Sequence, residues 1–333
     1  MSDADGTAPR YRPPSPRLTL PLTADQLPEN PGFERIILSG PVPAEEDWAV
    51  LAAYMRRYPH LGLYVESDLR DLEFLRHFPW LRMFSFLAPD VESIDGLLHV
   101  AENLRILELS PTKRRLSLSK ILERLPQVHR LGVDGQWQGL NVLGDLPSLR
   151  SLTLSSIKVD SLDFLRGATG LVMLFLRLGK VDDISDLTSL PHLQEITVYR
   201  TRIGDLAPLS DCVQLAYLQL ESVPAAMLPD LSKLTHLKVL WLANLAGMDD
   251  LTPVAAAPDL RYLLVQSPTL DPQALAVLRG HPTLEYLTAA LGSKKRIAQA
   301  YEAAPYPRDD DDKYQFRFRR ELAKQIFADP EAT

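Results

Sequence analysis

The chain has only one cysteine, Cys212, among its 333 residues, so no disulfide can form within it. So little cysteine is typical of proteins that fold in a reducing compartment. No stretch approaches the roughly 18 consecutive apolar residues that a membrane-spanning helix needs. The first residues also contain no apolar run of the kind found in signal peptides. From these absences we expect a cytoplasmic protein without membrane contact.

Several chemical signatures are missing as well. The sequence contains no glycine-rich phosphate loop, no metal-ligand spacing and no nucleophilic triad. We therefore expect no cofactor, no metal site and no catalytic residue. Cys212 occupies the place of a core leucine, where a buried thiol is usually inert. His192 and His236 lie two repeats apart, roughly 10 Å by strand spacing, which is too far to share a metal ion.

Positive charge is also in short supply, since the net charge is −7. A general nucleic-acid-binding protein would carry a basic patch or stripe. The two short basic islands, Lys113–Arg115 and Lys294–Arg296, are better explained as a solvated loop and a helix start. We therefore expect neither nucleic acid nor an anionic membrane as a partner.

What the sequence does contain is a repeat. From Leu149 to His236 it reads as four lines of 22 residues, each opening with L-x-x-[LI]-x-[LV]. A fixed period of this length is typical of solenoids, which grow by stacking rather than around one globular core. Less regular openings extend the series to twelve repeats; they occur at Phe33, Leu61, Leu81, Leu104, Val128, Leu237, Leu260 and Leu284.

The opening of each line predicts one strand of a parallel sheet. Side chains alternate along a strand, so the fourth and sixth places point into the core, as Leu152 and Leu154 do. The third, fifth and seventh places point to the opposite side. Short return segments with prolines favour 3₁₀ turns.

The lines resemble leucine-rich repeats of the short, internalin-like class, L-x-x-L-x-L-x-x-N-x-I-x-D-[IL]-x-P-L-x-x-L-x-x. The best match is at 193–214, where Ile203, Asp205, Leu206 and Pro208 are in place. The resemblance covers about 33–291 and implies an α/β solenoid. This would be a leucine-rich repeat horseshoe with a parallel β-sheet on the concave face and 3₁₀ or short helical returns on the convex face.

The sequence departs from that class at the ninth place, which has no asparagine. The residues found there are Ile157, Gly179, Thr201, Val223 and Leu245. The turns after the strands must therefore satisfy their backbone groups in another way.

The expected domain organisation has four parts. Residues 1–32 form a proline-rich flexible arm, in which Arg17–Leu22 is either an edge strand or part of a disordered leader. Residues 33–60 contain the first strand and a capping helix from Ala44 to Arg57. Residues 61–291 are the repeats, and residues 292–333 hold a C-terminal helix, an acidic linker and a capping tail.

In the C-terminal part we expect a helix at Ser293–Ala303 and a linker at Arg308–Asp312. Aromatic residues alternate in Tyr314–Phe318, which predicts a strand that pairs beside the last repeat strand. A helix at Glu321–Ala328 would then bury Leu322, Ile326 and Phe327 against that end. The competing hypothesis is that the linker leaves this tail free as a partner-binding peptide.

The outward positions from the seventh repeat onward carry large or charged side chains. They are Met173, Phe175, Arg177, Tyr199, Tyr217, Gln219, Glu221, Trp241, Tyr262, Leu264 and Tyr286. Neighbouring strands lie about 4.8 Å apart, so these side chains should form one continuous patch. Large apolar patches usually mark a partner. Two alternatives stay open: the aromatic side chains only pack across the strands, or the C-terminal tail folds back and covers them.

We therefore expect a monomeric, non-catalytic protein–protein interaction module. Its protein partner, of unknown identity, would bind on the C-terminal half of the concave face. A regulator or immunity protein that neutralises a toxin or enzyme would use the same binding physics. The alternative from another class is an enzyme, an enzyme regulator or an enzyme-associated subunit whose site lies in the terminal segments.

Overall fold

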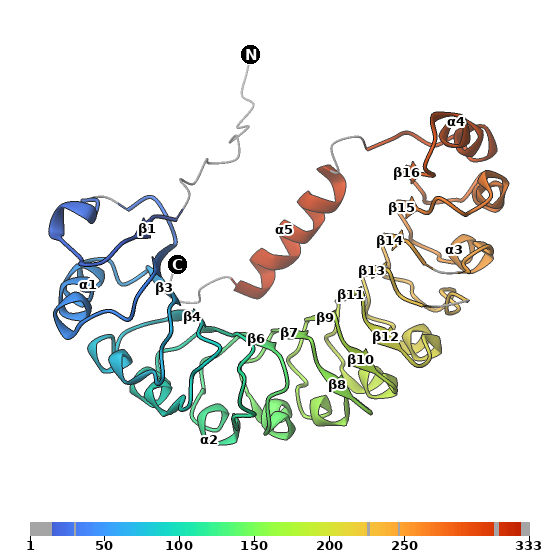
Figure 1. The fold of residues 1–333 in the computed structure, drawn as a ribbon. Helices are drawn as coiled ribbons and strands as arrows, with labels where there is room; N and C mark the ends of the chain where they lie inside the picture. The colour runs from blue at the N-terminus through green and yellow to red at the C-terminus, as the bar shows by residue number, and fades with distance from the viewer. Residues whose placement is uncertain (1–14, 30, 225–226, 246, 310–312, 328–333) are drawn as a thin grey trace, which may run out of the picture. The chain divides into compact units, whose positions relative to one another are not determined.

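The computed structural model describes residues 15–29, 31–224, 227–245, 247–309 and 313–327 (Figure 1). The chain divides into two compact units. Unit 1 contains Met1–Leu116 with Arg124–Gln127, and unit 2 contains Ser117–Glu123 with Val128–Thr333. Residues 1–14 and 30 of the expected arm lie outside the described residues.

Unit 1 is built on parallel strands that pair in chain order, β1-β2-β3-β4-β5. Its elements are β1 (Arg17–Leu18), η1 (Ala24–Gln26), β2 (Arg35–Ser39), α1 (Glu45–Arg57), β3 (Gly62–Glu66), η2 (Glu73–His77), β4 (Met83–Leu87), η3 (Asp95–His99) and β5 (Ile106–Leu109). Strand β1 pairs with β2, so the expected edge strand is confirmed for Arg17 and Leu18. Helix α1 confirms the helix expected from Ala44 to Arg57.

The elements of unit 2 follow the same plan. They are α2 (Ser119–Leu122), β6 (Arg130–Asp134), η4 (Leu140–Asp145), β7 (Ser151–Ser155), β8 (Lys158–Val159), η5 (Asp163–Leu165), β9 (Met173–Arg177), β10 (Lys180–Val181), η6 (Ser185–Ser189), β11 (Glu195–Tyr199), β12 (Arg202–Ile203), η7 (Ala207–Asp211), β13 (Tyr217–Glu221), β14 (Val239–Ala243), α3 (Thr252–Ala255), β15 (Tyr262–Gln266), η8 (Pro272–Leu278), β16 (Tyr286–Ala290), α4 (Lys294–Ala303) and α5 (Lys313–Phe327). The main sheet runs β6-β7-β9-β11-β13-β14-β15-β16, all parallel. A small second sheet joins β12, β10 and β8.

Every predicted repeat opening becomes a strand, with β2 to β5 in unit 1 and β6 to β16 of the main sheet in unit 2. Leu152, Leu174, Leu218 and Leu240 are fully buried at matching places of their strands. The return segments are mostly 3₁₀ helices, as their prolines and shortness predicted. The predicted fold class, an α/β solenoid of leucine-rich repeats with a parallel sheet, is therefore confirmed.

Two backbone arrangements replace the missing asparagines in unit 2. A residue with positive φ follows each regular strand, and its N–H donates to the last carbonyl of the next strand; these residues are Ser156, Leu178, Arg200, Ser222 and Asn244. The small sheet then bonds the ninth-place backbone, since Lys180 N–H donates to the Ile157 carbonyl at 2.8 Å. The ninth-place side chains of Ile157, Val223 and Leu245 are buried. Apolar packing and backbone bonds therefore fill the role of the amide ladder.

The last strand of the sheet is covered by α4 and the segment after it. Tyr301 Oη donates to the Leu287 carbonyl at 2.9 Å and accepts from Ala289 N–H at 3.2 Å. Leu287 N–H donates to the Pro307 carbonyl at 3.0 Å. Helix α4 confirms the helix expected at Ser293–Ala303. Three backbone groups of β16 are thus paired by α4 and Pro307 and not by a further strand.

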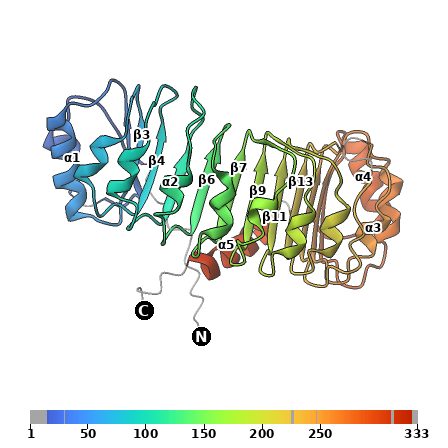
Figure 2. The same ribbon diagram turned by 90° about the horizontal axis from the view of Figure 1, so that it is seen from below.

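The predicted strand at Tyr314–Phe318 is wrong, because these residues lie within the single helix α5. The separate helix expected from Glu321 is the second half of α5, which ends at Phe327. Figure 1 shows α5 on the side of the unit 2 strands that faces away from the returns. Figure 2 shows that it passes near one end of those strands.

Candidate partner-binding face

The strand register sorts the outward side chains of β9, β11, β13, β14, β15 and β16 into three rows. We call this surface the strand face. The first row is Met173, Glu195, Tyr217, Val239, Tyr262 and Tyr286. The second row is Phe175, Thr197, Gln219, Trp241, Leu264 and Thr288. The third row is Arg177, Tyr199, Glu221, Ala243, Gln266 and Ala290.

All the predicted site residues fall on the strand face, where the register brings them together. Their exposure differs between rows. Tyr217 and Tyr262 are fully buried, and Met173 and Leu264 are 6% exposed. By contrast, Arg177 of the third row is exposed and Tyr199 is half-buried. Part of the predicted patch is therefore interior, whereas the third row is open at Arg177 and Gln266 and buried at Ala243.

The cover over the buried part is α5. Tyr217, Val239, Tyr262 and Leu264 form a buried cluster, against which α5 places Tyr314 and Phe318; the half-buried Trp241 and Tyr286 also join it. The Tyr314 ring stacks on that of Tyr262, with ring centres 5.9 Å apart and planes within 3°. Of the two alternatives to a free patch, the tail that folds back is the arrangement observed.

The start of α5 is fixed by a neighbouring carboxylate. Tyr314 N–H donates to Asp309 Oδ2 at 2.7 Å, which satisfies one of the free donors of the first helical turn. The residue before Asp309 is also held in place, because the Arg308 guanidinium lies 4.0 Å from the ring centre of Tyr301 in α4. Asp309, from the segment expected to be only a linker, therefore contributes directly to the placement of α5, while residues 310–312 of that segment lie outside the described residues.

An ion pair joins α5 to the first row of the strand face. Arg319 Nη2 lies 2.7 Å from Glu195 Oε1, and the Glu195 side chain is fully buried. The same guanidinium lies over the rings of Tyr217, at 5.1 Å, and Phe175, at 5.7 Å. Burial raises the pKa of Glu195, and the nearby Arg319 acts in the opposite direction. A cation at this position therefore favours the charged form of the carboxyl group.

A chain of polar side chains crosses β13 from the covered row to the open row. Tyr217 Oη donates to Gln219 Oε1 at 3.1 Å, and Gln219 Nε2 donates to Glu221 Oε2 at 3.1 Å. In the third row, Arg177 lies 6.0 Å from the ring centre of Tyr199. These contacts link Tyr217, Gln219 and Glu221 across β13 and place the Arg177 guanidinium beside the Tyr199 ring.

The register of the repeats places Glu195 among the outward residues that border the predicted patch, and it does occupy an outward place in β11. The residues of α5 that complete the site were missed. Tyr314 and Phe318 were assigned to a strand, and nothing in their local pattern indicates which part of the chain they contact. Arg319 was missed for the same reason. Leu322 is buried, at 5% exposure, but it lies beside Gln194 and Ala216 and not against the last strand as expected. The side chains of Ile326 and Phe327 lie outside the part of the chain that the structure describes.

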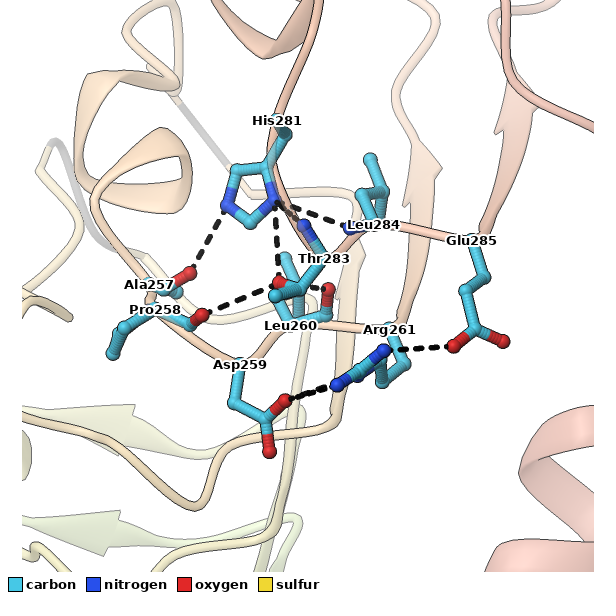
Figure 3. Close-up of polar contacts among 9 residues, drawn as sticks. All are labelled: Ala257, Pro258, Asp259, Leu260, Arg261, His281, Thr283, Leu284 and Glu285. Carbon is cyan, nitrogen blue, oxygen red and sulfur yellow. Dashed lines mark hydrogen bonds and ion pairs between the residues drawn. The ribbon is translucent and has the colours of Figure 1, made fainter.

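The final repeats, on which α5 begins, are held by a polar network (Figure 3). Nδ1 of His281 accepts from Leu284 N–H at 3.2 Å, while Nε2 lies 3.0 Å from the Ala257 carbonyl. Arg261 bridges Asp259 and Glu285 through ion pairs of 2.8 and 3.0 Å. These contacts join β15 to β16 and fix the strands that carry Tyr262 and Tyr286.

The cysteine and the two histidines weighed as possible chemical or metal-binding residues do not form a site. Cys212 is buried, and burial raises the pKa of its thiol to about 12. His192 and His236 are exposed at the ends of their repeats. Within the described residues, no three His, Cys, Asp or Glu side chains are grouped closely enough to hold a metal ion. No helix in that part of the chain has the length and apolar character to cross a bilayer.

No family model and no curated protein matches the sequence, but solved structures resemble it. An internalin from Listeria monocytogenes has a TM-score of 0.55 at 18% identity, over 81% of this chain and 78% of that chain. A leucine-rich repeat protein from Leptospira interrogans has a TM-score of 0.52 at 14% identity, over 89% of this chain and 88% of that chain. TLR13, in its complex with ssRNA13, has a TM-score of 0.55 at 18% identity, over 78% of this chain and 46% of that chain. The expected likeness to internalin-type leucine-rich repeat proteins is confirmed at the level of the fold.

Proposed function

We propose that this protein is a non-catalytic interaction module that binds a protein partner on the strand face of unit 2. One observation carries the proposal: the strand face already holds a helix. Helix α5 is seated there through ring stacking, apolar contacts and a buried ion pair. A surface that holds one amphipathic helix has the shape and chemistry to bind another.

The residue types of the strand face support the same function. Tyrosine, tryptophan and arginine are enriched among the residues that dominate interface energetics. The open third row offers Arg177, Tyr199 and Glu221 beside the covered aromatic cluster. A partner could therefore make its first contacts on the third row without moving any part of this chain. We include a monomeric state and a cytoplasmic location in the proposal.

Site-specific photo-crosslinking tests this function. A benzophenone amino acid replaces Tyr199 in one full-length protein, and replaces Val213, which is 43% exposed on the return side, in a matched control. Both are irradiated in extract of the native cell, and crosslinked proteins are identified by mass spectrometry. We expect a partner that crosslinks at Tyr199 and not at Val213. Equal crosslinking at both positions, or none at Tyr199, would contradict the proposed surface.

A further inference from the structure

Helix α5 contacts the strand face through a simple spacing. Tyr314, Phe318 and Leu322 recur every four residues and so lie on one side of the helix. Four residues span about 6 Å along a helix, close to the roughly 4.8 Å between neighbouring strands. Tyr314 accordingly contacts Tyr262 of β15 and Tyr286 of β16, whereas Phe318 lies with Gln194 and Ala216, which directly precede β11 and β13. Any helix with large side chains at this spacing could lie across the strands in the same way.

Charge adds selectivity to this spacing. Glu195 is a fully buried carboxylate in an aromatic surface, and Arg319 is the cation beside it. A helix with an apolar or acidic residue at that place would leave the carboxylate buried and unpaired, which is costly. Five residues of α5 are basic and one is acidic, in a chain with a net charge of −7. The strand face is thus suited to a basic helix and disfavours an acidic one.

The fit between α5 and the strand face is incomplete. Within the described residues, the buried Nε1–H of Trp241 has no hydrogen-bond acceptor. A cavity of about 290 Å³ lies beside α5, lined among others by Gln194, His236 and Phe318. In the third row, Arg177 and Gln266 are exposed. A longer or differently shaped helix could fill more of this surface than α5 does.

We propose that α5 is an exchangeable occupant of the strand face and that the partner docks through a helix of its own. The docking helix is amphipathic and basic, with two aromatic residues four apart and an arginine directly after the second. It enters by way of the third row, displaces α5 and pairs its arginine with Glu195. This inference rests on the proposed function and adds the class of partner segment and the regulation of the site.

A peptide exchange experiment on the full-length protein tests the inference. The probe is a fluorescent, end-blocked peptide with the sequence of residues 313–327, and its binding is followed by anisotropy. An opened protein carries Tyr314→Ser and Phe318→Ser, which remove the two aromatic anchors without a change of charge. A tethered helix competes at an effective concentration of the order of millimolar. We therefore expect the probe to bind the opened protein at least about tenfold more tightly than the unsubstituted protein.

Two controls make the result specific. Arg317→Gln with Arg320→Gln alters two exposed residues of the same helix, so α5 stays in place and the probe should bind as weakly as to the unsubstituted protein. A probe with Arg319→Glu should bind the opened protein at least about tenfold more weakly. Adding Glu195→Arg to the opened protein should restore the binding of that altered probe and weaken the binding of the original one.

Several outcomes would overturn the inference. They are equal binding of the probe to the opened and unsubstituted proteins, no binding to either, or indifference to the charge of residue 319. Sequencing the segment that crosslinks at Tyr199 gives a further check, because an acidic or non-helical segment rules out the proposed partner class. The proposed function is judged separately. It stands if Tyr199 captures a partner while the probe fails, and it fails if the probe exchanges but Tyr199 captures nothing.

Discussion

Adjacent residues of β13 have opposite roles because strand side chains alternate. Leu218 is fully buried in the solenoid core, whereas Gln219 lies half-buried on the strand face, where it accepts from Tyr217 and donates to Glu221. The first is held by packing on every side and the second by two hydrogen bonds. The free energy of unfolding should therefore respond very differently to truncation at the two positions.

We predict that Leu218→Ala lowers the free energy of unfolding by about 2–5 kcal/mol, because it leaves a cavity in the core. Gln219→Ala should lower it by about 1 kcal/mol, the usual net contribution of a hydrogen bond. Chemical denaturation followed by circular dichroism measures both. Losses of the same size would contradict a register of β13 in which Leu218 faces the core and Gln219 faces outward.

Glu195 shows how a single buried charge can act on selectivity more than on stability. Its pKa is raised because burial outweighs the opposing influence of Arg319. A buried ion pair often gains little net stability over an apolar contact, but loss of one partner is strongly unfavourable. The pair therefore contributes mainly by penalising any helix that lacks a cation at this place.

At the scale of elements, α5 shows where sequence reasoning reached its limit. Tyr314, Phe316 and Phe318 alternate as in a strand, but Tyr314, Phe318 and Leu322 also recur every four residues, as in a helix. Five residues cannot separate the two periods, and the longer window decides for the helix. The position of the helix on the strand face depends on contacts distant in sequence, such as that between Arg319 and Glu195, which no local pattern encodes.

His281 lies between η8 and β16 and bonds the backbone of Leu284. We expect this contact to make the stability of the fold depend on pH. Burial lowers the pKa of His281 from its ordinary value of 6.5, because the folded state favours the neutral ring. The neutral Nδ1 accepts from the Leu284 backbone, and a proton there would abolish that bond. This contribution to stability is thus fully present above about pH 6.5 and is lost as the pH falls through the lower folded pKa.

We predict that the melting temperature of the unsubstituted protein exceeds that of His281→Gln at pH 8 and that the difference shrinks between pH 6.5 and 5. Carboxylates that titrate in the same range are common to both proteins, so they cancel in the difference. Thermal melts at half-unit pH steps provide the measurement. A difference that stays constant over this range would show that His281 does not change its protonation on unfolding.

At the scale of the whole molecule, the sequence predicted the positions of the repeats but not their division into two compact units. The leucines at fixed places predict the strand positions directly, because each repeat buries the same side of its strand. The division into two units near residues 117–127 was not predicted. The irregular repeat there retains the leucine pattern, so the pattern itself gives no sign of the boundary. Only part of the site could be predicted. The repeat register identifies the residues of the strand face, but it does not show that α5 lies on them.

Helix α5 shields the buried aromatic cluster of the strand face from solvent. A chain that stops after Arg308 lacks α5 and exposes Tyr217, Val239, Tyr262 and Leu264, which are now buried. Each kilocalorie per mole lost from the free energy of unfolding should lower the melting temperature of a unit of this size by about 2–4 °C. The exposed aromatic surface should also bind a hydrophobic dye and promote self-association.

Differential scanning calorimetry, dye fluorescence and light scattering measure these effects, with a chain that stops after Phe327 as the control. The control keeps α5 and should match the full-length protein in all three measurements. If the shorter chain melts at the same temperature, binds no dye and stays monomeric, α5 does not protect the strand face. Because α4 and Pro307 already pair the last strand, any loss seen only in the shorter chain belongs to the strand face and not to the end of the sheet.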